Sequence, residues 1–379
     1  MNAARSKKKA FLFIPLGILL IYFIWLGFLL LTFRTYQGPS QAFPLEAEGV
    51  YHIHSKLSDG WGTVDKIVRA GSGNRLDFLI LTDHGNPNLQ SLASQGWKEG
   101  VLILAGSELS VSRGHLVALD FRLPSQPFSQ NTENAVHEIT ALGGFTIIAH
   151  PYSKVKWSWG EYVGYSGLEI INGDSMLRSN LSHALPYFPA LLLKPEFVLL
   201  KMLSNPSSFL ARWDERNARF PLYGYFGTDA HLFYRPAFTL LHLHLLLQKP
   251  LSRDFETAKN QVFSALRSGR FYNAIDAAAR AKGFGFAAKK GNRTSPMGET
   301  VRLDSPVRLE VQAPYSFKLE IDLICNGKKI TSSRAKTLSY ETTMPGIYRV
   351  EVFLRERSPL DKGVPWIVSN PIFLKEETR

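Results

Sequence analysis

Two histidines, His52 and His54, end an apolar segment near residue 50, in the sequence VYHIH. In an extended strand alternate side chains point to the same side, so both imidazoles would face one pocket, about 6–7 Å apart at their Cα atoms. Such a pair is suited to grip one metal ion. The pattern alone is weak evidence, because His242 and His244 repeat it within TLLHLHLLL with no carboxylate nearby in the sequence. That second pair is expected to be structural.

Further metal-ligating residue types follow other short apolar runs. They are Asp59 in SDGWG, His84 after FLILTD, Glu108 after VLILAGS, His115 after Gly114, His150 after FTIIA, and Asp229 and His231 in GTDAH. The carboxyl ends of neighbouring parallel strands converge on one pocket, so ligands far apart in the sequence can meet there. Because the chain has one cysteine, the set contains His, Asp and Glu, which suits Zn, Mn or Fe. One ion uses about four to six ligands, so two or three divalent ions are predicted.

The intervening segments predict the elements that position these residues. From about residue 48 to 247, short apolar runs alternate with helical stretches, a rhythm that favours an α/β fold with a mostly parallel sheet. Residues 252–268 carry an apolar stripe and end at Gly269, which predicts an amphipathic helix with a glycine cap. From about residue 276 the apolar residues alternate with a period of two, which predicts a small antiparallel β-sandwich.

Residues 10–33 are 24 consecutive uncharged residues, which as a helix would span about 36 Å and cross the hydrocarbon core of a bilayer. Basic residues precede this segment, so the N-terminus is expected to be cytoplasmic and the remainder extracytoplasmic. The alternative, a buried terminal helix, is disfavoured because the segment has no polar face. A second apolar stretch, 189–203, is interrupted by charged residues and Pro195, and is expected to be a buried or surface-docked helix.

The predicted organisation has five parts. They are a basic cytoplasmic N-terminus at 1–9, a single membrane anchor at 10–33, a tether at 34–47, the α/β domain at 48–275 and the β-sandwich at 276–379.

Length and charge exclude several classes. With 379 residues and 45% hydrophobic content, the chain can bury full-sized cores, so disorder is excluded as its main state. The first 34 residues hold five of the 44 basic residues and no acidic ones, leaving 39 basic against 32 acidic residues in the remainder. This diffuse excess is compatible with an anionic substrate but lacks the basic, aromatic-interleaved stripe of a nucleic-acid-binding protein. No nucleic-acid partner is predicted, and protein partners are left open.

In chain order, the motifs resemble those of the polymerase and histidinol phosphatase (PHP) superfamily of metallohydrolases. The matching motifs are His52-x-His54, Ser58-Asp59-Gly60, Thr82-Asp83-His84, Glu108, Gly114-His115, Ala149-His150-Pro151 and Gly227-Thr228-Asp229-Ala230-His231. The resemblance covers roughly residues 49–247 and implies a distorted (βα)7 barrel with a trinuclear metal site. The C-terminal stretches, including PWIVSNPIFL, are similar to the branch with a C-terminal β-sandwich that includes a carbaryl hydrolase.

Each metal position is implied by this resemblance. His52, His54, Glu108 and Asp229 would hold the first ion; Asp59, His84 and His231 the second; and Glu108, as a bridge, with His115 and His150 the third. Some family members have a histidine in place of Asp59, and a carboxylate there is still an ordinary hard ligand.

The predicted protein is a membrane-anchored, multinuclear metal-dependent hydrolase. The preferred activity is that of a phosphoesterase that uses a metal-bound hydroxide. Asp83 is the candidate proton acceptor or supporting group, with a helix or turn cap as its alternative role. Arg113, Lys154, Lys156 and Arg178 follow predicted strand ends and are candidates for binding an anionic substrate. Hydrolysis of a carboxylic ester or carbamate, or a non-catalytic binding role, are the alternatives.

Overall fold

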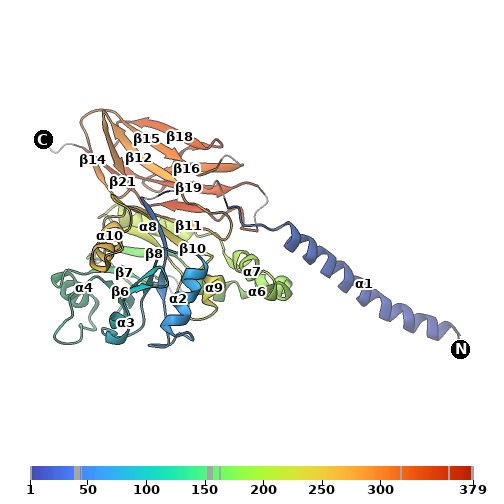
Figure 1. Ribbon diagram of the computed structural model, residues 1–379. Helices are drawn as coiled ribbons and strands as arrows, with labels where there is room; N and C mark the ends of the chain where they lie inside the picture. The colour runs from blue at the N-terminus through green and yellow to red at the C-terminus, as the bar shows by residue number, and fades with distance from the viewer. Residues whose placement is uncertain are drawn as a thin grey trace.

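The computed structural model describes residues 2–37, 43, 45–151, 157–161, 164–315, 318–356 and 359–376, with the backbone alone for residues 2–14. A long N-terminal helix, α1 (Asn2–Thr32), projects from a mixed α/β body, and a β-rich C-terminal part lies against the same body (Figure 1). The expected mixed α/β fold and β-rich C-terminal part are therefore confirmed.

Two sheets form the α/β body. The first contains β1 (Glu46–Ile53), β2 (Phe78–Leu81) and β4 (Val101–Ala105) as parallel neighbours, with β3 (Gly96–Lys98) antiparallel at its edge. The second has the order β5 (Ser107–Val111), β6 (Gly114–Leu119), β7 (Phe145–Ile148), β8 (Gly167–Asn172) and β9 (Tyr223–Gly227). In it, β7, β8 and β9 are parallel, while β6 is antiparallel to both of its neighbours.

Short backbone links join the two sheets at both edges. A parallel bridge pairs His84, after β2, with Glu108 in β5. On the other side, His54 N donates to Ala230 O at 3.0 Å and Thr228 N donates to Tyr51 O at 3.0 Å, which ties the end of β9 to the end of β1. The strands thus close into a barrel-like ring in which all strands but β6 and the edge strand β3 point the same way. Because β6 is antiparallel, the count of seven βα repeats is not confirmed.

Helices cover this ring and line its ends. They are α2 (Val64–Gly73), α3 (Leu89–Ala93), α4 (Thr132–Ala141), α5 (Gly173–Ser179), α6 (Leu181–Ala184), the 3-10 helix η1 (Leu185–Leu192), α7 (Pro195–Met202), α8 (Ser207–Asn217), α9 (Tyr234–Ala237) and α10 (Phe255–Arg267).

The predicted amphipathic helix before Gly269 is α10. Asp254 caps its N-terminus by accepting a hydrogen bond from Thr257 N, and Gly269 follows its end with a φ of 67°. The predicted stripe is buried at Ala258, Val262, Ala265 and Leu266. The stripe therefore faces the core, as its spacing predicts.

The β-rich C-terminal part continues the first sheet of the body. From β1 the sheet passes through β10 (Leu241–Leu246) and β11 (Phe271–Ile275) to β20 (Ile367–Ser369), β19 (Gly346–Leu354), β21 (Ile372–Glu376) and β14 (Thr300–Leu303), and β16 (Leu319–Cys325) and β17 (Lys328–Ser333) branch from β19. A separate sheet contains β13 (Arg293–Pro296), β12 (Gly285–Lys290), β15 (Val307–Gln312) and β18 (Thr337–Thr342).

Two features differ from the simple sandwich predicted from the sequence. β14 and β21 are parallel, so the part is not wholly antiparallel. β11 pairs with β20 across the expected boundary at residue 275, so backbone hydrogen bonds join the two parts. A single sheet thus runs from the α/β body into the C-terminal part.

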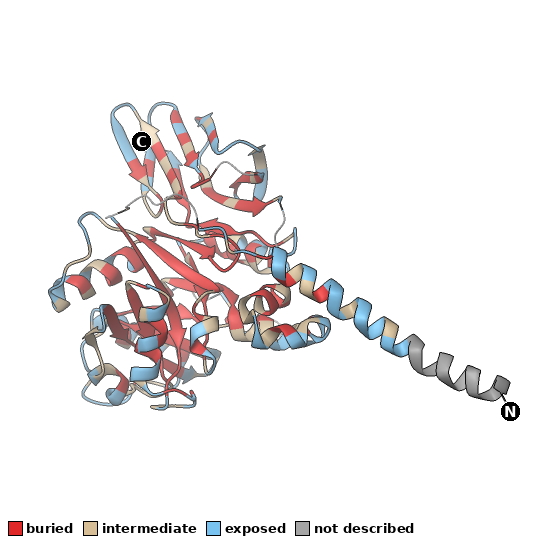
Figure 2. Cartoon of the chain, turned by 45° about the vertical axis from the view of Figure 1, so that its right-hand side comes forward, coloured by how far each residue is buried: buried red, intermediate tan, exposed pale blue. Residues whose placement is uncertain are grey.

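The buried residues are concentrated in the strands. In Figure 2 the strands of the body are almost continuously buried, whereas the described part of α1 is mostly exposed. Leu26 and Leu30 on α1 are buried, as is Phe33 directly after it. The expected tether lies partly outside the described residues, and its start is held by Thr35 Oγ1, which donates to Ala277 O at 2.9 Å.

Candidate metal centre

The carboxyl ends of β1, β2, β7 and β9 and the beginnings of β5 and β6 bring the predicted ligands together. His52 lies near the end of β1 and Glu108 lies in β5, while His150 and Asp229 follow β7 and β9 directly. His54, Asp59, His84, His115 and His231 complete the set in four groups whose potential ligand atoms lie within 4.8 Å of one another. All nine predicted ligands therefore face one site, although they span 180 positions of the sequence.

The first predicted group brings Glu108 and Asp229 to the same pair of histidine nitrogens. His52 Nε2 and His54 Nε2 lie 3.1 Å apart. Glu108 Oε2 lies 3.2 Å from the first nitrogen and 3.0 Å from the second. Asp229 Oδ1 lies 3.3 Å from each nitrogen. Ligand atoms bound at about 2.0–2.1 Å to a tetrahedral ion are separated by about 3.3 Å. This separation is close to the distances from the two histidine nitrogens to each other and to the two carboxylate oxygens.

The second predicted group surrounds Asp59. Its Oδ2 atom lies 3.3 Å from His231 Nε2 and 3.7 Å from His84 Nε2. Its Oδ1 atom lies 3.4 Å from His54 Nδ1. The imidazole of His54 thus stands between the first and second groups, with one ring nitrogen directed to each.

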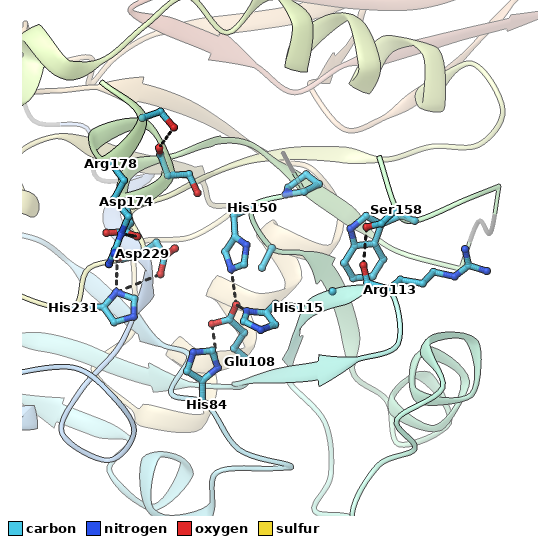
Figure 3. Close-up of a pocket in the computed structure, with 16 residues that line it drawn as sticks. His84, Glu108, Arg113, His115, His150, Ser158, Asp174, Arg178, Asp229 and His231 are labelled. Carbon is cyan, nitrogen blue, oxygen red and sulfur yellow. Dashed lines mark hydrogen bonds and ion pairs between the residues drawn. The ribbon is translucent and has the colours of Figure 1, made fainter. Parts of the chain in front are cut away.

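The third predicted group centres on the other oxygen of Glu108. Glu108 Oε1 lies 2.9 Å from both His115 Nδ1 and His150 Nε2. Because Oε2 belongs to the first group, this one carboxylate joins two groups. Figure 3 shows Glu108 between His84, His115 and His150.

Two features of these contacts fit metal ions better than hydrogen bonds alone. Two Nε2 atoms in contact at 3.1 Å can form at most one hydrogen bond between them, whereas both can bind one ion. The Nδ1 atom of His54 is buried and has no hydrogen-bond partner among the described residues. Buried polar atoms are normally satisfied, so an unpaired imidazole nitrogen 3.4 Å from the Asp59 carboxylate fits the donor set that a divalent ion needs.

Glu169 is a site residue that the sequence reading missed. Its Oε1 atom lies 2.5 Å from His52 Nδ1, and its Oε2 atom accepts hydrogen bonds from His150 N at 2.7 Å and Asn172 Nδ2 at 2.8 Å. It is fully buried within the apolar strand β8. A charged residue inside the run LEIIN is the signal that could have identified it, since such residues are seldom buried unless paired.

The backbone is bent at three of the site residues. His52, His150 and Asp229 have φ values of 67°, 27° and 53°. Positive φ is unfavourable for residues other than glycine and concentrates at functional sites, where the surrounding structure enforces it. The strain turns these side chains away from the regular strand direction and toward the common site.

Opposite charges within the site shift the pKa values of its histidines and carboxylates. Burial alone would lower the pKa of His54, but hydrogen bonds to Asp229 and Glu108 outweigh this effect and raise that pKa to about 9. Burial alone would raise the pKa of Glu108, but the positive charge of His52 and the hydrogen bonds from His115 and His150 hold it well below its usual range. Without ions the site therefore holds protonated imidazoles between carboxylates, and metal binding must release protons.

Asp83 lies behind the site and does not line the cavity. Ser55 N donates to its Oδ1 at 2.6 Å, and Ser55 Oγ and Ser58 Oγ donate at 2.8–3.0 Å. The residue is fully buried. These contacts fit the alternative of a turn cap, because the carboxylate holds the turn that carries Asp59.

A cavity of about 610 Å³ opens in front of the ligand set. Arg178 and Arg113 line it, on opposite sides in Figure 3, as does the buried Trp159. Arg178 Nε lies 2.5 Å from Asp174 Oδ2, and Arg113 Nη2 lies 2.5 Å from Glu133 Oε1. Both predicted arginines thus line the cavity, and each is paired with a carboxylate. The predicted Lys154, like Lys156, lies outside the described residues.

The second HxH pair forms a separate, fully buried cluster with Glu48 and Asp276, whose potential ligand atoms also lie within 4.8 Å of one another. His242 Nδ1 lies 2.7 Å from Glu48 Oε1, and His244 contacts Glu46 Oε1 and Asp276 Oδ2 at 2.8 Å through its two nitrogens. These contacts are nitrogen to oxygen at hydrogen-bond length, as in a buried ion-pair network. The carboxylates come from distant segments, which is why none was visible near the pair in the sequence.

No protein-family model matches the chain. An uncharacterized protein of Methanocaldococcus jannaschii, MJ1587, is 25% identical over 136 residues, which cover 32% of this chain and 79% of that protein.

Similar solved structures are more distant in sequence. A two-domain protein from Bacteroides vulgatus, described as containing a predicted PHP-like metal-dependent phosphoesterase, has a TM-score of 0.45 and 16% identity, covering 89% of this chain and 99% of that one. A candidate metal-dependent phosphoesterase from Bifidobacterium adolescentis has a TM-score of 0.34 and 14% identity, covering 60% of this chain and 97% of that one. An amidohydrolase from Chromobacterium violaceum has a TM-score of 0.33 and 18% identity, covering 48% of this chain and 87% of that one.

Proposed function

We propose that this chain is a membrane-anchored, metal-dependent hydrolase of the PHP superfamily, and that it acts as a phosphoesterase with two or three divalent ions. The observation that carries the proposal is the position of Glu108. One of its oxygens contacts His52 and His54, and the other contacts His115 and His150. A carboxylate shared between two histidine groups is an arrangement that can bridge neighbouring ions.

Divalent ions at this site would activate water at neutral pH and offset negative charge on the phosphoryl oxygens. The remaining tasks fall to the protein. Glu169 holds His52 in one orientation through its Nδ1 atom. Arg178, at the cavity wall, carries a guanidinium suited to bind phosphate oxygens. Asp83 fixes the turn that positions Asp59.

Membrane anchoring is supported by α1. Residues Pro15–Thr32 form a helix long and apolar enough to cross a bilayer, and only 11% of this segment is buried against the protein. Exposed apolar side chains on such a helix are unfavourable in water but favourable in lipid. With the basic residues before it on the cytoplasmic side, the folded parts lie outside the cytoplasm.

The orientation is tested by protease digestion of intact and permeabilised cells that express the full chain. Digestion of the folded parts in cells whose cytoplasmic membrane is intact supports this orientation, whereas protection until that membrane is opened contradicts it.

The enzymatic proposal is tested by metal content and hydrolysis on the same samples. The full chain is purified in detergent without chelator, beside a His54→Ala/Asp229→Ala double variant. Both are reconstituted with Zn, Mn or Fe and given matched chromogenic phosphate esters, carboxylic esters and carbamates. Two to three ions per parent chain and phosphate-ester hydrolysis, both lost in the double variant, are expected.

Other outcomes distinguish the alternatives. Bound ions with turnover of carboxylic esters or carbamates alone would replace the phosphoesterase proposal by a carboxylic ester or carbamate hydrolase. Less than one ion per chain after reconstitution would contradict the catalytic proposal and favour a binding module.

A further inference from the structure

An apolar surface lies beside the membrane helix. It is formed by α6, η1 and Leu193, residues 181–193, a segment without Asp, Glu, Lys or Arg. Its exposed large side chains are Leu181, Leu185, Phe188, Leu192 and Leu193. Leu192 is 92% exposed and Leu193 75%. A cluster of exposed apolar side chains of this kind marks an interaction site rather than ordinary surface.

The α6–η1 surface contacts α1 well inside the apolar segment of that helix. Tyr22 Oη donates a hydrogen bond to Pro186 O at 2.9 Å, and the rings of Trp25 and Tyr187 lie 5.8 Å apart. Figure 1 shows α6 and α7 close to the end of α1 that meets the body. η1 and the middle of α1 therefore occupy the same level along the helix axis.

Lys194 fixes this arrangement at the end of α1. Its Nζ atom donates to Leu30 O at 2.6 Å and to Phe33 O at 2.8 Å. The last carbonyl groups of a helix have no partner within the helix, so an ammonium group satisfies them and complements the negative end of the helix dipole. The charged residue that ends the apolar segment 181–193 thus lies at the level where α1 ends.

The length of α1 then determines what surrounds η1. Tyr22 lies about 15 Å along the helix from Thr32, which is about half of the ~30 Å hydrocarbon core. If Tyr22 stood outside the bilayer, only residues 10–21 would remain, about 18 Å of helix, and a span needs about 20 residues. A helix that spans the membrane must therefore carry its η1 contact into the lipid.

We propose that the α6–η1 surface is embedded in the leaflet on the side of the folded domain, with Leu185, Leu192 and Leu193 against lipid acyl chains. The inference rests on the membrane anchoring proposed above. The described part of α1 carries exposed apolar side chains and contacts η1 through Tyr22 and Trp25, so one lipid phase would cover both.

Embedding would also orient the candidate active site. Only Asn180 separates α6 from α5, and α5 carries Asp174 and Arg178 on the cavity wall. The lipid contact would then hold one wall of the cavity next to the membrane surface.

The test places a fluorescent label at chosen depths. Leu192→Cys, in a Cys325→Ala background, is labelled with bimane in the full chain and reconstituted into vesicles of phosphatidylcholine and phosphatidylglycerol. Leu20→Cys on α1 is the lipid reference and Met344→Cys, exposed in the β-rich part, is the water reference. Quenching by brominated lipid and by aqueous iodide is compared. We expect the label at Leu192 to follow that at Leu20, with at least twofold more lipid quenching than at Met344.

Three other results would overturn the inference, each for a different reason. If Leu20 is quenched by lipid but Leu192 by iodide, the anchor stands and the α6–η1 surface lies in water. If neither label is quenched by lipid, the proposed anchoring fails and the inference fails with it. If Leu192 is shielded from both quenchers, protein such as a second copy of the chain covers the surface. Because Leu192 is almost fully exposed, its substitution leaves the fold unchanged.

Discussion

Glu169 Oε1 lies 2.5 Å from His52 Nδ1, on the ring edge opposite to the nitrogen that faces Glu108 and Asp229. A carboxylate in this position fixes the orientation of an imidazole ligand and strengthens it as a donor. Glu169 also accepts a hydrogen bond from the backbone of His150, so one buried side chain holds two of the predicted ligands.

A Glu169→Gln variant tests this role. Loss of the negative charge should weaken metal binding by about 10–100-fold while preserving most of the packing. Isothermal titration of the metal-free chain with Zn or Mn measures the change. Glu310→Gln, in the β-rich part, is the matched control and should bind as the parent does. Equal affinities for Glu169→Gln and the parent would show that Glu169 supports the fold alone.

Glu108 and Asp59 should differ in how many ions their loss removes. Glu108 contacts histidines of two predicted groups, whereas Asp59 belongs to the group with His84 and His231. We expect Glu108→Gln to lose more than one ion per chain and Asp59→Asn to lose about one. Metal analysis after gel filtration measures both. Identical losses in the two variants would contradict the shared position of Glu108.

Arg178 should affect binding of substrate more than its conversion. It lies on the cavity wall with an exposed side chain paired to Asp174. A charge-assisted hydrogen bond contributes about 1.5–3 kcal/mol, so Arg178→Met should raise KM for a phosphate ester on the order of tenfold, with a smaller change in kcat. Arg212→Met, on the exposed surface of α8, is the control. An unchanged KM would remove Arg178 from the substrate site.

The buried network at the base of the ring should make stability depend on pH. Burial alone would lower the pKa of His244, but the negative charge of Asp276 and hydrogen bonds to Asp276 and Glu46 raise it to about 10, from 6.5. A group whose pKa is raised in the folded state stabilises that state, and the stabilisation is complete below about pH 6.5. It is lost as the pH rises through about 10.

Unfolding by denaturant at pH 6.5 and at pH 10 measures this contribution. We expect the free energy of unfolding to fall over this range in the parent and to change less in His244→Gln. Removal of one partner of a buried pair costs about 3–5 kcal/mol, so the variant should also be less stable at pH 6.5. Parallel pH profiles for the two chains would exclude His244 as the cause.

The two HxH pairs show what sequence patterns could and could not distinguish. His52 and His54 were predicted as ligands because carboxylates and histidines follow the neighbouring strands, and the structure brings all nine predicted residues to one site. The partners of His242 and His244 lie far from the pair in the sequence. Glu46 and Glu48 precede it and Asp276 follows it. Antiparallel pairing of β10 with β1 and β11 creates this proximity.

The sequence by itself determined the long apolar helix α1, the α/β alternation, the amphipathic helix α10 and the His, Asp and Glu residues that the structure brings together. Each of these follows from local periodicity or from residue types at the ends of apolar runs. Only the tertiary structure decided that Glu169 supports His52, that Asp83 is enclosed by serines, that the sheet continues through β11 and β20, and that η1 lies against Tyr22. These relations depend on contacts between segments distant in the chain. Periodicity reports which face of an element is buried but not which residue of another element it meets.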